Sequence, residues 1–229
     1  MHEKMLWYND NIQFLINQNI VEYDMVAASL SVSEVLHLLP KNVIDELKLL
    51  PKEKRTKKVG CLQRDDKEYS EKLLSGIRNI RKEFLTINEL NEENVITLHS
   101  DAVFFSSKKK INNIVHDVEF KHKNTWSSYI RYNRIEMFYN NGVIDYKGIP
   151  QEMIYQHTLG LNKYLIKIFE MLEDKDPDIY DYISTFQKNY LQDKLPEYYY
   201  QSFGKVGRYK LDNLNLLSYI AKIVMYTIK

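Results

Sequence analysis

The apolar positions in the first half of the chain alternate between short runs typical of buried strands and stripes typical of helices. Residues 20–25 and 95–105 are mainly apolar runs, which predict two buried strands. Between them, residues 26–39 predict one helix and residues 66–86 predict a longer amphipathic helix. The apolar stripe of the longer helix recurs at spacings of 4, 4, 3 and 4 residues and consists of Tyr69, Leu73, Ile77, Ile80 and Phe84.

The pattern predicts several further strands and breaks. Residues 6–15 are periodic enough for a short helix, with a strand as the alternative. Pro40 and Pro51 are each placed for the first turn of a helix. Three β-rich stretches follow, at residues 114–122, 126–138 and 143–149. Asn141-Gly142 lies between the last two and is a signal for a type I′ hairpin.

After Pro150 the pattern becomes helical. Three helices are expected, at residues 151–172, 177–195 and 212–229. The sequence therefore predicts an α+β fold, with a mixed half over about residues 1–150 and an all-helical C-terminal part.

Composition narrows the class of protein. A chain of 229 residues with 44% hydrophobic residues suits one large domain, or a domain with a small subdomain. No apolar run reaches the roughly 18 residues of a membrane span, and the polar start Met1-His2-Glu3-Lys4 predicts no secretory signal. The single cysteine, Cys61, excludes an internal disulfide and is expected to pack in a core. We therefore expect a cytoplasmic protein, and the bias towards Lys, Asn, Ile and Tyr is typical of a phage or a low-GC bacterial host.

Two aspartates stand at unusual positions in the apolar runs. Asp24 lies near the end of the first predicted strand and Asp101 lies inside the second. A carboxylate in such a place is costly unless it is paired or binds a metal. Two of them on neighbouring strands would suit a two-metal phosphoryl-transfer site, with Mg²⁺ or Mn²⁺ as the cofactor. An equally weighted alternative is that each carboxylate only caps the following helix or turn.

The net charge of +1 hides an uneven distribution. Residues 52–82 hold 11 basic against 5 acidic side chains, and residues 104–134 hold 7 against 2. Residues 170–197 reverse the balance, with 3 basic against 8 acidic. Charge runs are often only solvated surface, but both basic stretches flank the segment with Asp101. This arrangement favours a phosphate-bearing partner such as nucleic acid.

Three segments resemble motifs of the family B DNA polymerases. Residues 23–30, Tyr-Asp-Met-Val-Ala-Ala-Ser-Leu, resemble the first palm motif, in which a hydrophobic strand leads through Asp into a helix. Residues 98–105, Leu-His-Ser-Asp-Ala-Val-Phe-Phe, resemble the second, with Asp101 at its metal-binding aspartate and His99 in place of the other. Residues 144–149, Ile-Asp-Tyr-Lys-Gly-Ile, are similar to the Asp-x-Lys-Gly-Ile stretch beneath the primer.

The resemblance implies an arrangement of palm, fingers and thumb. Residues 1–39 would form the first part of the palm and residues 40–90 a helical insertion like the fingers. Residues 91–150 would complete the palm with a hairpin, and residues 151–229 would form a helical thumb. The helix over residues 72–84 is the candidate for the role of the fingers helix.

The resemblance also implies roles for individual residues. Asp24 and Asp101 would be catalytic metal ligands, and Ser29, five residues after Asp24, would pack against the sugar of the incoming nucleotide. Its small side chain favours acceptance of ribonucleotides. The phosphates of the nucleoside triphosphate would be bound from one helix by Arg78 and Lys82, with Arg81 or Lys72 as substitutes. Nucleic acid would meet Lys54, Arg55, Lys58, Lys121, Lys123, Arg131, Arg134 and Lys147, and Trp126, Tyr129 and Tyr132 are candidates for base stacking or for the core.

The function expected from this sequence is a minimal template-directed nucleotidyltransferase that extends a 3′-hydroxyl. A catalytically inactive palm that binds nucleic acid or serves in assembly is the first alternative. A metal-dependent nuclease is the second, with Glu22 or Glu119 as a conceivable third acidic ligand. Glu22 shares a strand face with Asp24, which keeps that alternative open. A partner subunit could supply the polymerase parts that are missing here.

Overall fold

The chain folds into two compact units. The computed structural model describes residues 4–148, 159–202, 205–206, 209–210 and 213–227. The first unit contains residues 1–10 and 20–125, and the second contains residues 11–19 and 126–229. Within the described residues no helix is long and apolar enough to cross a membrane.

The first unit is built on a six-stranded sheet with the strand order β1-β4-β5-β3-β7-β6. Its strands are β1 (Leu6–Tyr8), β3 (Ile20–Met25), β4 (Val95–His99), β5 (Ala102–Ser106), β6 (Ile114–Val115) and β7 (Val118–Trp126). Strand β5 pairs antiparallel with both β4 and β3, so β3 and β4 run parallel with β5 between them. The chain from β3 through helices to β4 and β5 is therefore a split β-α-β unit.

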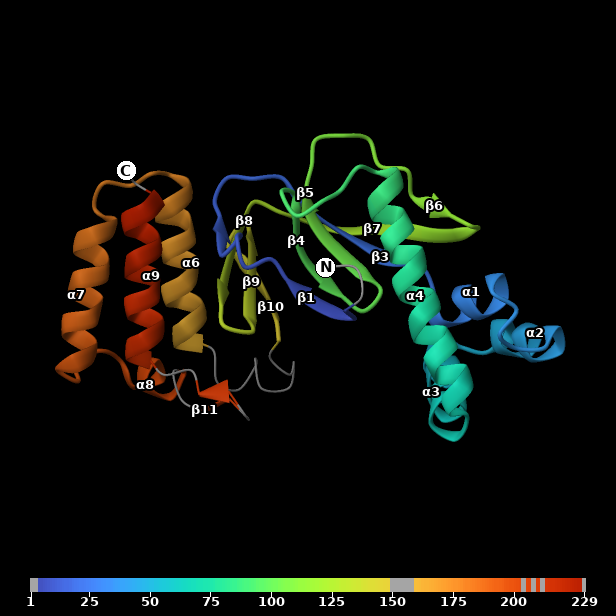
Figure 1. Ribbon diagram of the computed structural model, residues 1–229. Coiled ribbons are helices and arrows are strands. Elements are labelled where there is room, and N and C mark those ends of the chain that lie inside the picture. The colour runs from blue at the N-terminus through green and yellow to red at the C-terminus, as the bar shows by residue number, and fades with distance from the viewer. Residues whose placement is uncertain (1–3, 149–158, 203–204, 207–208, 211–212, 228–229) are drawn as a thin grey trace. The chain divides into compact units, whose positions relative to one another are not determined.

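Four helices connect β3 to β4 (Figure 1). They are α1 (Ala28–Val35), α2 (Lys41–Leu49), α3 (Lys52–Asp65) and α4 (Lys67–Ile87). Pro40 and Pro51 stand at the N-caps of α2 and α3, where the missing N–H of proline costs no helical hydrogen bond. The Asp66 side chain caps α4 by accepting a hydrogen bond of 2.9 Å from the amide of Tyr69.

Helix α4 covers the sheet with the stripe that its sequence predicted. All five residues of that stripe are buried, in one core with the sheet residues Leu98, Val103 and Phe105. The ring of Phe84 stacks on Phe120 of β7 with centroids 4.1 Å apart. Helix α4 thus anchors the sheet whose strand β3 carries Asp24 and whose β4–β5 turn carries Asp101.

The second unit combines a smaller sheet with the C-terminal helices. The sheet order is β10-β9-β8-β2, from β2 (Phe14–Leu15), β8 (Ser128–Tyr132), β9 (Ile135–Asn140) and β10 (Val143–Lys147). The other elements are α6 (Leu159–Glu173), α7 (Ile179–Leu191), α8 (Glu197–Ser202), β11 (Lys205–Val206), β12 (Tyr209–Lys210) and α9 (Asn213–Thr227). Tyr139 of β9 stacks on Phe169 of α6 at 4.8 Å, within a core shared by sheet and helices.

The fold confirms the predicted α+β class with antiparallel sheets. It decides one alternative that the sequence left open and differs from the sequence prediction in two further places. Residues 6–15 contain the strands β1 and β2, so of the two predictions for this segment the strand is confirmed and the helix is wrong. The run at residues 95–105 is a hairpin of two strands, because a tight turn divides it after His99. Residues 126–148 belong to the second unit instead of the sheet with Asp101, because their apolar faces pack on the C-terminal helices. The expected helix start at residues 151–158, and Ile149, lie outside the described residues.

Two glycines of the second unit have similar backbone angles in different surroundings. Gly142, in the predicted Asn-Gly turn between β9 and β10, has φ +78° and open space around it. Gly148 has φ +81°, and a Cβ built on it would lie 2.0 Å from the carbonyl oxygen of Arg134. Both positions favour glycine for its backbone, but only Gly148 also needs the missing side chain.

We expect Gly148→Ala to destabilise the fold more than Gly142→Ala. Both variants bear the cost of a left-handed backbone, about 1–2 kcal/mol. Gly148→Ala adds a clash with backbone that cannot rotate away, so its free energy of unfolding should be lower by a further ~1–3 kcal/mol. Urea denaturation of both variants and the wild type measures the difference, and equal losses would contradict the close approach to Arg134.

Candidate functional site

The pairing of β3 with β5 brings Asp24 and Asp101 together. Asp24 is the register partner of Ala102, and Asp101 precedes Ala102 in the two-residue turn between β4 and β5. The Met25 amide donates a 3.1 Å hydrogen bond to the backbone carbonyl of Asp101. Burial, and next the negative charge of Asp24, raise the pKa of the Asp101 carboxyl. The two carboxylates are therefore electrostatic neighbours at one end of the central strands β3 and β5.

A lysine on the adjacent strand β7 completes the carboxylate cluster. Lys123 Nζ lies 3.0 Å from Glu22 Oε1 and 3.5 Å from Asp24 Oδ2. Glu22 is 1% exposed, and its other oxygen accepts a 2.6 Å hydrogen bond from Asn124. Partial burial opposes the charge of Lys123, but its bonds to Glu22 and Asp24 outweigh burial and raise its pKa. Glu22 is thus a paired, buried carboxylate that fixes the position of Lys123.

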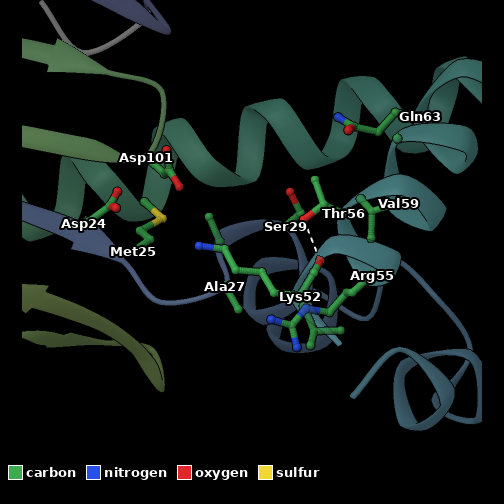
Figure 2. A pocket seen from close by; sticks show the side chains of 13 residues that line it. Asp24, Met25, Ala27, Ser29, Lys52, Arg55, Thr56, Val59, Gln63 and Asp101 are labelled. Carbon is green, nitrogen blue, oxygen red and sulfur yellow. Dashed lines mark hydrogen bonds between the residues drawn. The ribbon is translucent and has the colours of Figure 1, made fainter. Parts of the chain in front are cut away.

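Both aspartates open into a pocket of about 360 Å³. Figure 2 shows Asp24 and Asp101 at one end of it, with Lys52 and Arg55 of α3 across from them. Within the described part of the chain, neither Lys52 nor Arg55 forms an ion pair with an acidic side chain. The pocket also contains the hydroxyls of Ser29 and Thr56, and Thr56 donates a 2.9 Å hydrogen bond to the Lys52 carbonyl (Figure 2).

The first turn of α1 forms another wall of the pocket, through Ala28, Ser29 and Leu30. The chain enters this helix through Ala27, whose φ of 49° is a left-handed conformation that costs energy for a residue with a Cβ. Such a sharp entry lets the helix begin only a few residues after Asp24. The N-terminus of a helix favours negatively charged ligands.

The predicted phosphate-binding residues of α4 lie elsewhere. Arg78 is half-buried and Lys82 is exposed, and neither lines the pocket with the aspartates. Arg81 is fully buried and donates to backbone carbonyls of residues 4, 5 and 100, so it is removed from any nucleotide in this pocket. The basic wall comes from α3, because α3 and the start of α1 face the same cavity.

The predicted nucleic-acid contacts fall into three groups. Arg55 lines the pocket, and Lys54, Lys58 and Lys121 are exposed on the first unit, with Lys58 paired to Glu46 at 2.8 Å. Lys123 belongs to the carboxylate cluster. Arg131, Arg134 and Lys147 lie in the second unit, where Arg131 is buried, Arg134 is exposed and Lys147 pairs with Asp145 at 2.7 Å.

The remaining residues considered in the sequence analysis are the aromatic candidates, His99 and Cys61, and none of those described below lines the pocket. Trp126 and Tyr129 are buried in the second unit, so of the two roles expected for these aromatic residues, core packing is the one that these two have. His99 makes edge contacts with the rings of Tyr8 and Phe104. Cys61 is exposed on α3, so the expectation that it packs in a core is wrong. Helix α3 is mostly polar, and Val59 is its buried residue. Cys61 is therefore not part of an apolar face that could pack in a core.

Comparison with known proteins places the chain in a phage family. The whole sequence, residues 1–229, matches the family described as Bacteriophage PBS1 gene 130 protein. The chain belongs to this family. It is also 28% identical over 85 residues to Endonuclease GajA of Bacillus cereus strain HuB5-5, a match that spans 35% of this chain and 12% of the endonuclease. No solved structure matches the chain.

The proximity of the two aspartates has a consequence for titration. We expect Asp24→Asn to lower the pKa of Asp101, because it removes a neighbouring negative charge, while burial keeps the value above that of an exposed aspartate. In the wild type the raised pKa means that protonated Asp101 stabilises the fold at low pH. That contribution is lost as the pH rises through the raised pKa.

Titration of the Asp101 carboxyl carbon by NMR in metal-free buffer measures this shift. Asp117→Asn is the matched control, since Asp117 is an exposed residue of the β6–β7 turn and its change should leave the pKa of Asp101 as in the wild type. An Asp101 pKa that does not respond to Asp24→Asn would contradict the neighbouring position of the two carboxylates.

Proposed function

We propose that this protein is a metal-dependent nucleotidyltransferase that adds nucleotides to the 3′-hydroxyl of a nucleic acid, on a polymerase-like palm. One observation carries the proposal. A strand end and an adjacent hairpin turn of an antiparallel sheet bring two carboxylates to a pocket whose opposite wall carries two cations, which have no acidic partner among the described residues. The split β-α-β order of β3, β4 and β5 supports the palm, because both palm aspartates of the resembled family lie on such neighbouring strands.

The donor set fits magnesium. Among the described residues no group of three or more His, Cys, Asp and Glu side chains could hold a metal by itself. Mg²⁺ is usually held by one or two carboxylates together with water and substrate phosphates. Asp24 and Asp101 match that pattern, and their mutual repulsion favours a cation between them. A magnesium ion bound there would lower the pKa of the attacking hydroxyl and offset charge on the leaving pyrophosphate.

The opposite wall of the pocket suits the phosphates of a nucleoside triphosphate. Arg55 can donate two hydrogen bonds to a phosphate at once, and Lys52 adds a second positive charge. The first turn of α1 adds the positive end of a helix dipole. Phosphates between α3 and the aspartates would place the reacting phosphorus beside the carboxylates, so α3 replaces α4 in the proposed role.

The small side chain of Ser29 supports the use of nucleotides with either ribose or deoxyribose. It lies on the α1 wall, and its small side chain leaves room for a 2′-hydroxyl and can form a hydrogen bond with it. The proposed substrates are therefore ribonucleotides as well as deoxyribonucleotides. The nucleic acid would contact the exposed Lys54, Lys58 and Lys121, and its binding should weaken steeply with salt because phosphate contacts release counterions.

The partial match to an endonuclease favours a second candidate, hydrolysis of phosphodiesters by the same two carboxylates. Glu22, considered as a third metal ligand, is held by Lys123 and Asn124, so it would have to exchange partners to bind a metal. The two functions need different co-substrates. A transferase requires a nucleoside triphosphate, whereas a nuclease requires only water.

We expect Asp24→Asn and Asp101→Asn each to reduce primer extension about a hundredfold or more, because each removes a charged ligand from the reacting centre. The assay uses an end-labelled primer-template with Mg²⁺ and matched pools of ribo- and deoxyribonucleoside triphosphates. Asp117→Asn, an exposed change in the same unit, should retain wild-type extension.

Shortened products that form without any triphosphate, and that both variants abolish, would favour the nuclease. Binding to the labelled strand with neither extension nor cleavage under any of these conditions would leave a non-enzymatic binding protein.

A second prediction concerns α3. Arg55→Ala should raise the KM for the nucleotide about tenfold with a smaller effect on kcat, because one charge-assisted hydrogen bond is worth about 1.4 kcal/mol or more. Lys57→Ala is the control, since Lys57 is an exposed residue of the same helix and does not line the pocket. Equal KM values for both variants would remove α3 from the nucleotide site, even if extension by the wild type is observed.

A further inference from the structure

Arg81 is a buried arginine with backbone acceptors. It lies in the last third of α4 and is 0% exposed. Its Nη1 donates to the Met5 carbonyl at 3.2 Å and also to the Ser100 carbonyl, and its Nη2 donates to the Lys4 carbonyl. Among the described residues its Nε has no hydrogen-bond partner. This guanidinium therefore joins three separate parts of the chain at one point.

Burial of the Arg81 guanidinium has a cost in free energy. Moving a charge out of water is costly unless the protein replaces its hydration with hydrogen bonds. Burial lowers the pKa of Arg81 to about 10, which still leaves the side chain charged at neutral pH. A core leucine or methionine at this place would pack without that cost. An apolar side chain would, however, leave the backbone carbonyls of residues 4, 5 and 100 without this donor.

The three acceptors surround the turn that carries Asp101. Ser100 directly precedes Asp101 and has a left-handed backbone, with φ 46°. Its amide donates a 2.7 Å hydrogen bond to the Met5 carbonyl, which also accepts from Arg81. The carbonyl of Ser100 thus accepts from Arg81, and its amide donates to a carbonyl that Arg81 also contacts. We call this set of hydrogen bonds the junction. Ser100 cannot leave its left-handed conformation without breaking it.

We propose that Arg81 is a positioning residue that holds the β4–β5 turn, and with it the Asp101 carboxylate, in the metal-binding arrangement before any metal arrives. This inference rests on the proposed function, since it assigns Asp101 a metal. The planar guanidinium fork suits the task because it directs several donors to fixed acceptors at once.

The test compares Arg81→Lys with the wild type. Lysine keeps the charge but not the fork, so the variant should fold while its turn loses its fixed geometry. We expect the dissociation constant for Mn²⁺, measured from the EPR signal of the free ion, to rise about tenfold, and the Mg²⁺ concentration for half-maximal extension to rise in parallel. Ile80→Val, a buried change on the same helix, is the control for a loss of stability alone and should leave both values unchanged.

A measurement on the wild type tests the same inference without any variant. If the junction pre-forms the turn, the Ser100 amide should exchange slowly with deuterium in metal-free buffer, and Mn²⁺ should change its exchange rate little. Fast exchange that becomes slow only on addition of Mn²⁺ would overturn the inference, because the metal would then order the turn.

The outcomes separate this inference from the proposed function. Wild-type affinity for Mn²⁺ that persists in Asp101→Asn would refute the metal site, and the inference with it. Mn²⁺ binding that depends on Asp101 but is equal in Arg81→Lys and the wild type would overturn the inference alone.

Discussion

The antiparallel register of β3 against β5 is the constraint on which the candidate site depends. Strand Ile20–Met25 pairs with Ala102–Ser106 so that Asp24 faces Ala102, directly after the turn that holds Asp101. Side chains alternate between the two faces of a strand, so a slip of one residue would turn Asp24 to the other face of the sheet. The apolar partners on both strands prevent that slip, because they are buried under α4. The core thus fixes the distance between two charges that repel each other.

The surroundings of this carboxylate pair compensate for its charge in different ways. Lys123 lies 3.5 Å from Asp24 but is shared with the buried carboxylate of Glu22, and the charge of Arg81 acts on Asp101. Towards the pocket, the compensation is left to Lys52 and Arg55 and to any bound ligand. Carboxylates at one end of the pocket and cations across from them are the charge arrangement on which the proposed metal and nucleotide sites rest.

The elements that could be predicted from the sequence are those whose signals are local. The stripe of α4, the prolines before α2 and α3 and the Asn141-Gly142 hairpin all follow from spacing or turn chemistry, and the structure has them at those places. The pairing of Asp24 with Asp101 was expected from two apolar runs and a family resemblance. Arg81 was expected as a substitute phosphate ligand but is buried against backbone carbonyls, whereas Arg55, expected to contact nucleic acid, lines the pocket. Local sequence cannot distinguish the two, because burial of an arginine depends on which distant carbonyls surround it. The tight turn at residues 100–101 was not predicted, because the polar residues His99 and Ser100 are too few to mark a break in the apolar run.

The excursion of residues 11–19 into the second unit determines how this protein can be divided. The chain passes between the units three times, after Asp10, after Asn19 and after Thr125, so neither unit is a contiguous piece of sequence. A fragment ending at Thr125 would carry β2 without its partner β8, and a fragment beginning at Trp126 would leave that edge of β8 unpaired. An unpaired edge is a surface for aggregation. The two units are therefore inseparable by simple truncation, and an exchange of either one alone would need cuts after Asp10, after Asn19 and after Thr125.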